Sequence, residues 1–229
     1  MKRSRGAFVS VLGLAAILGL AAVLRLSGRD WDRGRLLHPD ERFLCMTVSA
    51  VGTPSSWTEY LDTARSPLNP HNRGHAFLVY GTLPLFAVRW LADAFSAESL
   101  PDIARLGRAA SAVVDTLSVL LVFLLGRRLY GRAAAWLAAL LYALCVLPIQ
   151  HAHFFTTDTW ATLFAFAFLY AAVRASSRGG LIDHAAAGLP LGLALACKIS
   201  LLPLAGVALL AAMLPALSAG GTEIGRAHV

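Results

Sequence analysis

Residues 7–26 read AFVSVLGLAAILGLAAVLRL, an apolar run in which Arg25, near its end, is the one charged residue. A membrane-spanning helix needs about 20 such residues. A cleaved signal peptide is the rival interpretation, but the run is long for one and no small-x-small cleavage motif precedes a polar start. We therefore predict a retained membrane span over 7–26. The basic residues at positions 2, 3 and 5 place the N-terminus in the cytoplasm.

The composition of the whole chain is that of a membrane protein. Of its 229 residues, 57% are hydrophobic and 14% are charged, whereas about a quarter of the residues in a soluble domain are charged. Further apolar runs predict membrane spans at about 104–125, 133–148, 159–173, 183–197 and 199–217. We therefore expect residues 1–217 to form part of one membrane domain, an all-α polytopic helix bundle.

Arginine clusters set the expected topology. In a soluble protein the net charge of +7 would point to nucleic acid. Here the arginines gather in two short loops between apolar runs, at 127–132 and 174–178. The positive-inside rule accounts for them, so we expect both loops in the cytoplasm and no nucleic-acid partner.

This topology requires that the apolar stretch 76–95 does not cross the membrane. The stretch contains Gly81, Pro84, Arg89 and Asp93, which suit an interfacial or re-entrant helix. Residues 27–102 then form a long first extracytoplasmic loop with juxtamembrane helices. Most of the reactive side chains of the chain fall on this outer side.

The first candidate for chemistry is the pentad 38–42, His-Pro-Asp-Glu-Arg, in that outer loop. Two adjacent carboxylates, Asp40 and Glu41, are costly beside a membrane unless they face water, partners or substrate. One can accept a proton from an attacking hydroxyl or amine, and the other can orient substrate or bind a cation. The alternative is a plain helix N-terminus over 40–51, because Pro39 and first-turn carboxylates suit one.

A second outer loop carries His151, His153 and Asp158. The two histidines and the acid could ligate a metal, although a loop that orients phosphate or sugar is the better interpretation. Asp158 or the threonine before it could equally cap the next helix. The loop 69–75, which contains Arg73, could line a substrate cleft.

Lys198 interrupts the last apolar stretch, where a lone cation needs a partner. The phosphate of a lipid carrier is one candidate, and snorkelling of the side chain to the interface is the other.

The cysteines lie far apart without a C-x-x-C pair, so they specify neither a metal site nor a disulfide framework: Cys45, Cys145 and Cys197.

Together these features resemble the GT-C membrane glycosyltransferases that use polyprenyl-phosphate-linked sugars, a group that includes protein O-mannosyltransferases and aminoarabinose transferases. The family hallmark is an Asp-Glu pair in the first outer loop, which Asp40 and Glu41 match. Other matching stretches are the proline-containing segment 80–86, the arginine-flanked run 104–130, the loop 150–158 and the lysine segment 193–199. The resemblance covers most of the chain to about residue 215.

The resemblance implies a glycosyltransferase of the bacterial plasma membrane with an extracytoplasmic active face. It would transfer a hexose or pentose from a polyprenyl-phosphate carrier to a protein, lipid or glycan acceptor, with inversion. Asp40 would be the general base, and Lys198 or an arginine would stabilise the departing phosphate. Glu41 is the second expected catalytic-site residue and would help to shape the sugar pocket. The other expected substrate-binding residues are His38, Arg73, His151, His153 and Asp158. No metal ligand is assigned, and only a divalent cation is left open as a cofactor.

A transporter or flippase subunit is the alternative function. An inverted repeat, or charges spread through the spans, would favour it, and the sequence has neither. A purely structural scaffold leaves the outward clustering of acids and histidines unexplained.

Residues 224–229, Ile-Gly-Arg-Ala-His-Val, match the translation of a common short-read sequencing adapter. We therefore expect them to be an artefact and exclude them from the interpretation of the fold. We expect the chain to be an N-terminal fragment of a longer enzyme that is inactive alone.

Overall fold

The computed structural model describes residues 2–226, with side chains for residues 10–215. Of the segment 224–229, residues 227–229 and all the side chains lie outside this description. The described part is 76% helix and contains no strand, which confirms the all-α prediction. The helices in chain order are α1 Lys2–Leu26, α2 Pro39–Ala50, α3 Trp57–Leu61, η1 Pro70–Arg73, α4 Leu83–Ala94, α5 Leu100–Leu144, α6 Val146–Ala152, α7 Thr157–Arg178, α8 Leu181–Cys197, η2 Ile199–Leu201 and α9 Leu204–Arg226.

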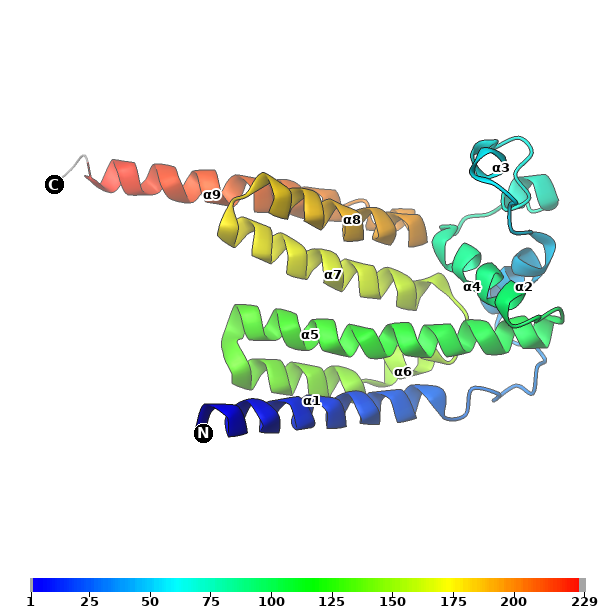
Figure 1. The fold of residues 1–229 in the computed structure, drawn as a ribbon, viewed down its shortest axis with the longest axis horizontal. Helices are drawn as coiled ribbons and strands as arrows, with labels where there is room; N and C mark the ends of the chain where they lie inside the picture. Colours follow the sequence, from blue (N-terminus) through cyan, green and yellow to red (C-terminus); the bar gives the residue numbers. More distant parts are fainter. Residues whose placement is uncertain (1, 227–229) are drawn as a thin grey trace.

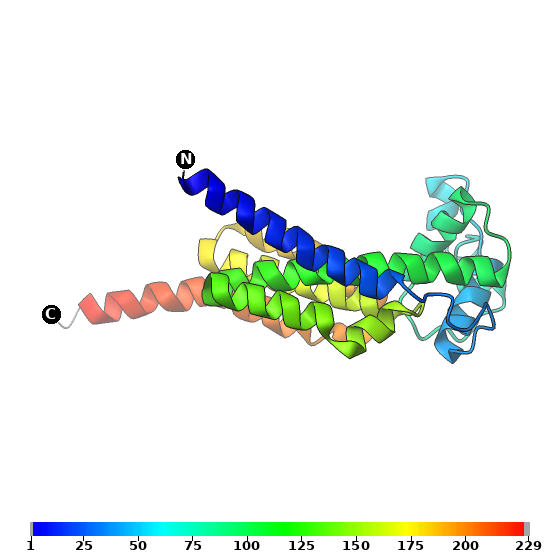
Figure 2. The same cartoon turned by 90° about the horizontal axis from the view of Figure 1, so that it is seen from below.

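The long helices lie side by side, and the short helices gather at one end (Figures 1 and 2). In the bundle α1 packs against α5, α5 against α7, and α7 against both α8 and α9. Helices α2, α3 and α4 form an end domain at the N-terminal end of α5. The two termini lie at the opposite end of the bundle.

Helix α5 is a hairpin of two helices and not one straight rod. Gly131 has φ +86° and ψ −174°, a conformation essentially restricted to glycine, and it separates the arms 100–130 and 132–144. The second arm stops at Leu144, earlier than the predicted boundary at residue 148. In a continuous helix the ring of Pro148 would clash with the carbonyl of Leu144, so the chain breaks at Cys145 and restarts as α6.

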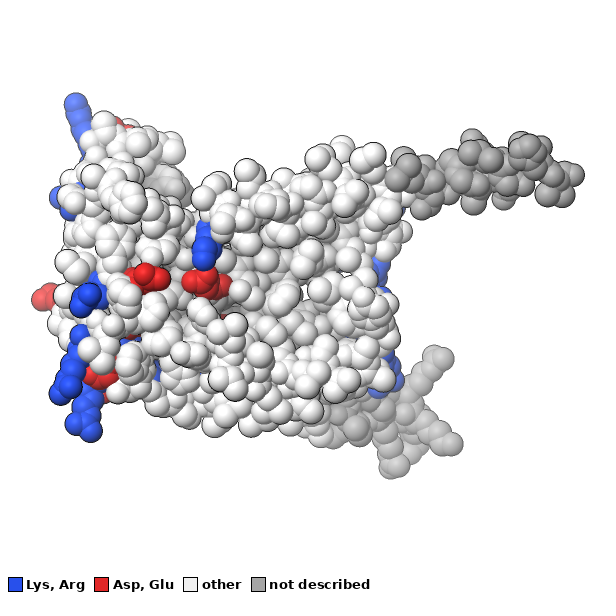
Figure 3. Space-filling model, turned by 180° about the vertical axis from the view of Figure 1, so that it is seen from behind, with Lys and Arg blue, Asp and Glu red and all other residues white. Residues whose placement is uncertain are grey.

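The two ends of the bundle separate the charged groups as the topology requires. The loops 127–132 and 174–178 lie at the end that carries the termini, and the pentad lies in the end domain. Figure 3 shows basic side chains at both ends and a largely uncharged flank between them. Among the described residues, two helices are long and apolar enough to cross a membrane, Leu100–Leu144 and Thr157–Arg178, and shorter apolar helices cover 10–26, 181–197 and 199–215.

Helix α4 begins later than predicted. The stretch 76–82 is an irregular loop, and the helix covers only the 12 residues Leu83–Ala94. A helix of that length extends about 18 Å, whereas the hydrocarbon core of a bilayer is about 30 Å thick. Its length therefore suits a juxtamembrane helix, and its place relative to a membrane stays a prediction.

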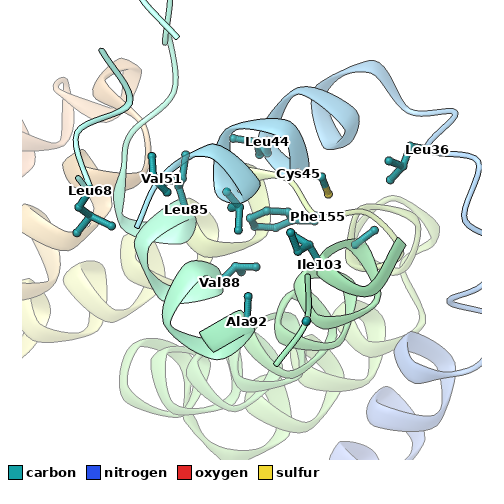
Figure 4. Close-up of a cluster of buried hydrophobic side chains, with 13 residues drawn as sticks. Leu36, Leu44, Cys45, Val51, Leu68, Leu85, Val88, Ala92, Ile103 and Phe155 are labelled. Carbon is teal, nitrogen blue, oxygen red and sulfur yellow. The ribbon is translucent and has the colours of Figure 1, made fainter. Parts of the chain in front are cut away.

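The end domain has its own apolar core, which joins three helices (Figure 4). Leu44 from α2, Leu85 and Val88 from α4, and Ile103 from α5 are fully buried in it. Phe155, from the connection between α6 and α7, is also fully buried in the same cluster. The core therefore ties the end domain to the start of α7, where the predicted second outer loop lies.

The topology predicts which end of the bundle is accessible from outside the cell. In a Cys145→Ser background, the two remaining cysteines are buried. Single cysteines are then placed at exposed positions of opposite ends, as Ala64→Cys in the end domain and Tyr130→Cys in the α5 hairpin. An impermeant thiol reagent should label residue 64 in intact cells and residue 130 only after permeabilisation. Labelling of residue 130 in intact cells would contradict the topology.

Candidate active site

Arg108 is the centre of a buried ion-pair network at the junction of the end domain and the bundle. Its Nη1 and Nη2 donate to the two carboxylate oxygens of Asp32 at 2.8 and 2.9 Å. Its Nε and Nη2 donate to the two oxygens of Glu41 at 2.7 and 2.5 Å. All three side chains are at most 1% exposed. Each pair is bidentate, which is the strongest geometry for a guanidinium and a carboxylate.

Further contacts extend this network in three directions. Nη1 of Arg108 also donates to the carbonyl of Arg29 at 2.7 Å, and its guanidinium lies 5.5 Å from the ring centroid of Trp31. Glu41 Oε1 accepts from the backbone N–H of Phe155 at 2.8 Å. The network thus joins the segment after α1, helix α2, helix α5 and the segment before α7.

Gly107 allows Phe155 to reach its position. A Cβ atom at residue 107 would lie 2.4 Å from the ring of Phe155, closer than any real Cβ contact. The ring therefore rests directly on the backbone of α5, beside Arg108. This contact and the bond to Glu41 together hold the start of α7 against α2.

The two adjacent acids of the pentad face different environments. Glu41 is fully buried in the network, whereas Asp40 is partly exposed. Successive residues of an α-helix point about 100° apart, so one of two neighbours can face the core while the other faces out. The sequence led us to expect both acids at the substrate. In the structure the Glu41 carboxylate is bonded to Arg108 and to the Phe155 N–H, and only Asp40 remains accessible.

Tyr80 brings Asp40 together with the start of α7. Burial, a side-chain hydrogen bond to Asp40, and the negative charges of Asp40 and Asp158 raise the pKa of Tyr80 to about 12. In this hydrogen bond the phenol donates to the Asp40 carboxylate. Two acids from distant parts of the sequence thus lie near one hydroxyl.

Backbone contact between the Tyr80 loop and α8 completes the cluster. The N–H of Gly81 donates to the carbonyl of Cys197 at 3.0 Å. A Cβ at residue 81 would lie 2.1 Å from the Ala196 carbonyl oxygen, so only glycine permits this approach. Lys198 follows directly, and its Nζ donates to Asp158 Oδ1 at 2.7 Å.

The cluster of Asp40, Tyr80, Asp158 and Lys198 is the candidate active site. Lys198 and Asp158 are 39% and 40% exposed, so both remain accessible to a ligand. Figure 3 shows a basic side chain against an acidic one, with a second acidic side chain close by, where the end domain meets the bundle. The arrangement offers a carboxylate to take up a proton and an ammonium group to meet an anion.

The other predicted site residues lie apart from this cluster, except His151. His38 is the N-cap of α2, where its Nδ1 accepts from the Glu41 N–H at 3.3 Å, and its ring packs on Phe154. The ring nitrogens of His153 lie 2.7 Å from the carbonyls of Ile149 and Ser27. Arg73 is exposed at the end of η1, with its Nε 3.5 Å from the Pro67 carbonyl.

Helix caps account for part of the pentad without excluding a role in catalysis. Helix α2 does begin at Pro39, with Asp40 and Glu41 in its first turn, as the helix N-terminus interpretation predicts. Helix α7 has Thr156 at its N-cap with no side-chain cap bond, so neither Thr157 nor Asp158 caps it. Asp158 is instead free to pair with Lys198.

No ready metal site forms in the part of the chain that the structure describes. Among these residues no three His, Cys, Asp or Glu side chains group closely enough to hold a metal ion. His151 and His153 belong to different contacts. The divalent cation considered from the sequence stays a prediction.

Sequence reasoning missed three important residues, Arg108, Asp32 and Tyr80. Arg108 is a charge near the start of an apolar run, and a charge there needs a partner. This rule singles out Arg108 and predicts that acidic side chains lie beside it in the fold. Tyr80 carries no comparable signal, because its role depends on the contact between Gly81 and α8.

A family model described as dolichyl-phosphate-mannose-protein mannosyltransferase matches residues 86–220, more than half of the chain. The chain therefore belongs to this family of GT-C-like membrane glycosyltransferases, which confirms the resemblance found in the sequence. No curated protein and no solved structure matches the chain. The matched range includes Arg108, Asp158 and Lys198, and it begins after Asp40 and Tyr80.

The close approach at Gly81 predicts a position-specific effect of one methyl group. Gly81→Ala should lower stability by about 1–3 kcal/mol, because the loop must move away from α8. Gly192→Ala in α8 is the matched control, since a Cβ there meets nothing within 4 Å. Thermal unfolding in detergent measures both, and equal melting of Gly81→Ala and the wild type would contradict the contact.

The network also predicts how stability depends on pH. Side-chain hydrogen bonds from Arg108 lower the pKa of Asp32 from 3.8 to about 2. Because the pKa of Asp32 is lower in the folded state than in the unfolded state, the ionised carboxylate stabilises the folded protein at pH values above the unfolded-state pKa. This stabilisation is lost as the pH falls through the folded-state pKa of about 2. The loss is about 2 kcal/mol between pH 4 and pH 2.

Asp32→Asn should abolish that component of the pH dependence in unfolding experiments. Asp30→Asn, an exposed carboxylate two residues away, should keep the wild-type slope. If the Asp32→Asn variant keeps the wild-type slope as well, the network does not hold Asp32 as described.

Proposed function

We propose that the protein transfers a sugar, mannose by the name of its family, from a polyprenyl phosphate to a hydroxyl of a protein acceptor on the extracytoplasmic side. The observation that carries this proposal is the cluster of Asp40, Tyr80, Asp158 and Lys198. It supplies a base and a cation at the mouth of a membrane bundle, which is where a lipid-linked donor and a water-soluble acceptor can meet.

The proposed step is a single displacement. The acceptor oxygen attacks the anomeric carbon on the face opposite the phosphate, and a new C–O bond forms. The bond from the anomeric carbon to the phosphate oxygen breaks, and its electron pair stays on the phosphate. The acceptor proton passes to the Asp40 carboxylate. One displacement inverts the anomeric configuration.

Tyr80 and Lys198 assist at opposite ends of this step. The Tyr80 hydroxyl bonds to Asp40, which supports a fixed orientation of the carboxylate toward the acceptor. Lys198 uses one of its three N–H groups on Asp158, and the others remain free to stabilise the charge that develops on the departing phosphate. Asp158 is then a positioning residue for the ammonium group.

Glu41 has a positioning role in this proposal. Its carboxylate is enclosed by Arg108 and the Phe155 N–H, so it does not touch substrate. It fixes the first turn of α2, from which the neighbouring Asp40 projects. Loss of Glu41 therefore affects activity through folding, and loss of Asp40 affects the chemical step itself.

The proposal predicts opposite behaviour for the two adjacent acids in the full-length protein. Asp40→Asn should lower turnover by ~10²–10⁴-fold with an unchanged melting temperature, because it removes a base and keeps the shape. Glu41→Gln should lower the melting temperature, since breaking a buried ion pair costs about 3–5 kcal/mol.

The assay measures transfer from polyprenyl phosphomannose at equal amounts of folded protein. Asp62→Asn, at a partly exposed carboxylate of the end domain, is the control and should leave turnover unchanged. Wild-type turnover by Asp40→Asn would show that Asp40 is only part of a helix N-terminus.

A further inference from the structure

A cavity of about 270 Å³ lies on the bundle side of Asp158. It is lined by both arms of α5, by α6 and by α7, and it is open on one side. Its polar lining comes from Asp115, Tyr142, His151, Asp158, Thr159 and Thr162, and two residues of α6 supply apolar surface. Its volume corresponds to roughly nine water molecules, which is the scale of a monosaccharide.

Two polar atoms of the lining have no hydrogen-bond partner among the described residues. They are Nδ1 of His151 and Oγ1 of Thr159, and both are buried. A buried polar atom without a partner destabilises a fold by about 1–3 kcal/mol. Both residues line the cavity, and a ligand bound there would supply the missing bonds once these side chains turn toward it.

Asp115 gives the cavity a carboxylate whose charge is already compensated. Its Oδ2 accepts from Arg25 Nε at 2.5 Å, and its Oδ1 accepts from the Tyr142 hydroxyl at 2.9 Å. Each of these oxygens keeps a further acceptor site, and so does the Tyr142 hydroxyl. The lining therefore offers acceptors and hydroxyls, without a free cation that would attract a phosphate.

We propose that this cavity binds the neutral sugar ring of the lipid-linked donor while the phosphate stays outside it at Lys198. The inference rests on the proposed function and adds the place where the sugar is recognised. Asp158 connects the two parts, because its carboxylate pairs with Lys198 and also lines the cavity. The sugar hydroxyls would bond to His151, Thr159 and Asp115, and the anomeric carbon would lie at the cavity mouth.

The test compares two lipids that differ only in the sugar, polyprenyl phosphomannose and polyprenyl phosphate, on the full-length protein. Thr159→Val and Thr162→Val remove hydroxyls with little change of shape. Each should weaken binding of the sugar-bearing lipid by about 3- to 10-fold, the loss of one hydrogen bond. Binding of the bare phosphate, measured as an inhibition constant, should be unchanged.

Thr157→Val is the matched control. The Thr157 hydroxyl is also buried without a partner, but Thr157 does not line the cavity, so neither affinity should change. Equal weakening of both lipids by the Thr159 and Thr162 variants, or no weakening of either, would overturn the assignment of the cavity. If the wild-type protein transfers no lipid-linked sugar at all, the proposed function fails first, and the inference fails with it.

Discussion

The bidentate pairing of Arg108 with Asp32 and Glu41 is the interaction on which the arrangement of the site depends. Desolvating three charges is costly unless their geometry satisfies nearly every donor and acceptor, and here five hydrogen bonds from Arg108 do so. The network joins elements that are far apart in the sequence. It buries one acid of the pentad, and the neighbouring acid is thereby presented to the site.

The site forms where the end domain meets the helix bundle, because three separate segments converge there. Helix α2 brings Asp40, the loop before α4 brings Tyr80, and the ends of α7 and α8 bring Asp158 and Lys198. Two glycines, Gly81 and Gly107, permit the close backbone contacts that hold these segments together. The convergence supports an enzyme that takes one substrate from the lipid phase and the other from water.

Much of the fold follows from composition and apolar run length, but the site follows only in part. The apolar runs and the family resemblance predicted an all-α membrane protein, and the structure and the family match confirm it. The pattern could not show which of Asp40 and Glu41 faces inward, because that depends on Arg108, which lies 67 residues from Glu41. Nor could it place the loop before α4, whose position depends on a backbone contact at Gly81.

The most direct measurement is a structure of the full-length protein in lipid nanodiscs with a non-hydrolysable phosphonate analogue of the sugar donor. The account predicts that the phosphonate contacts Lys198 and that the anomeric carbon lies between the Asp40 carboxylate and the mouth of the cavity beside Asp158. Helix α2 should be held by Arg108 as described. A donor bound away from Lys198, with its anomeric carbon out of reach of an acceptor at Asp40, would contradict the account.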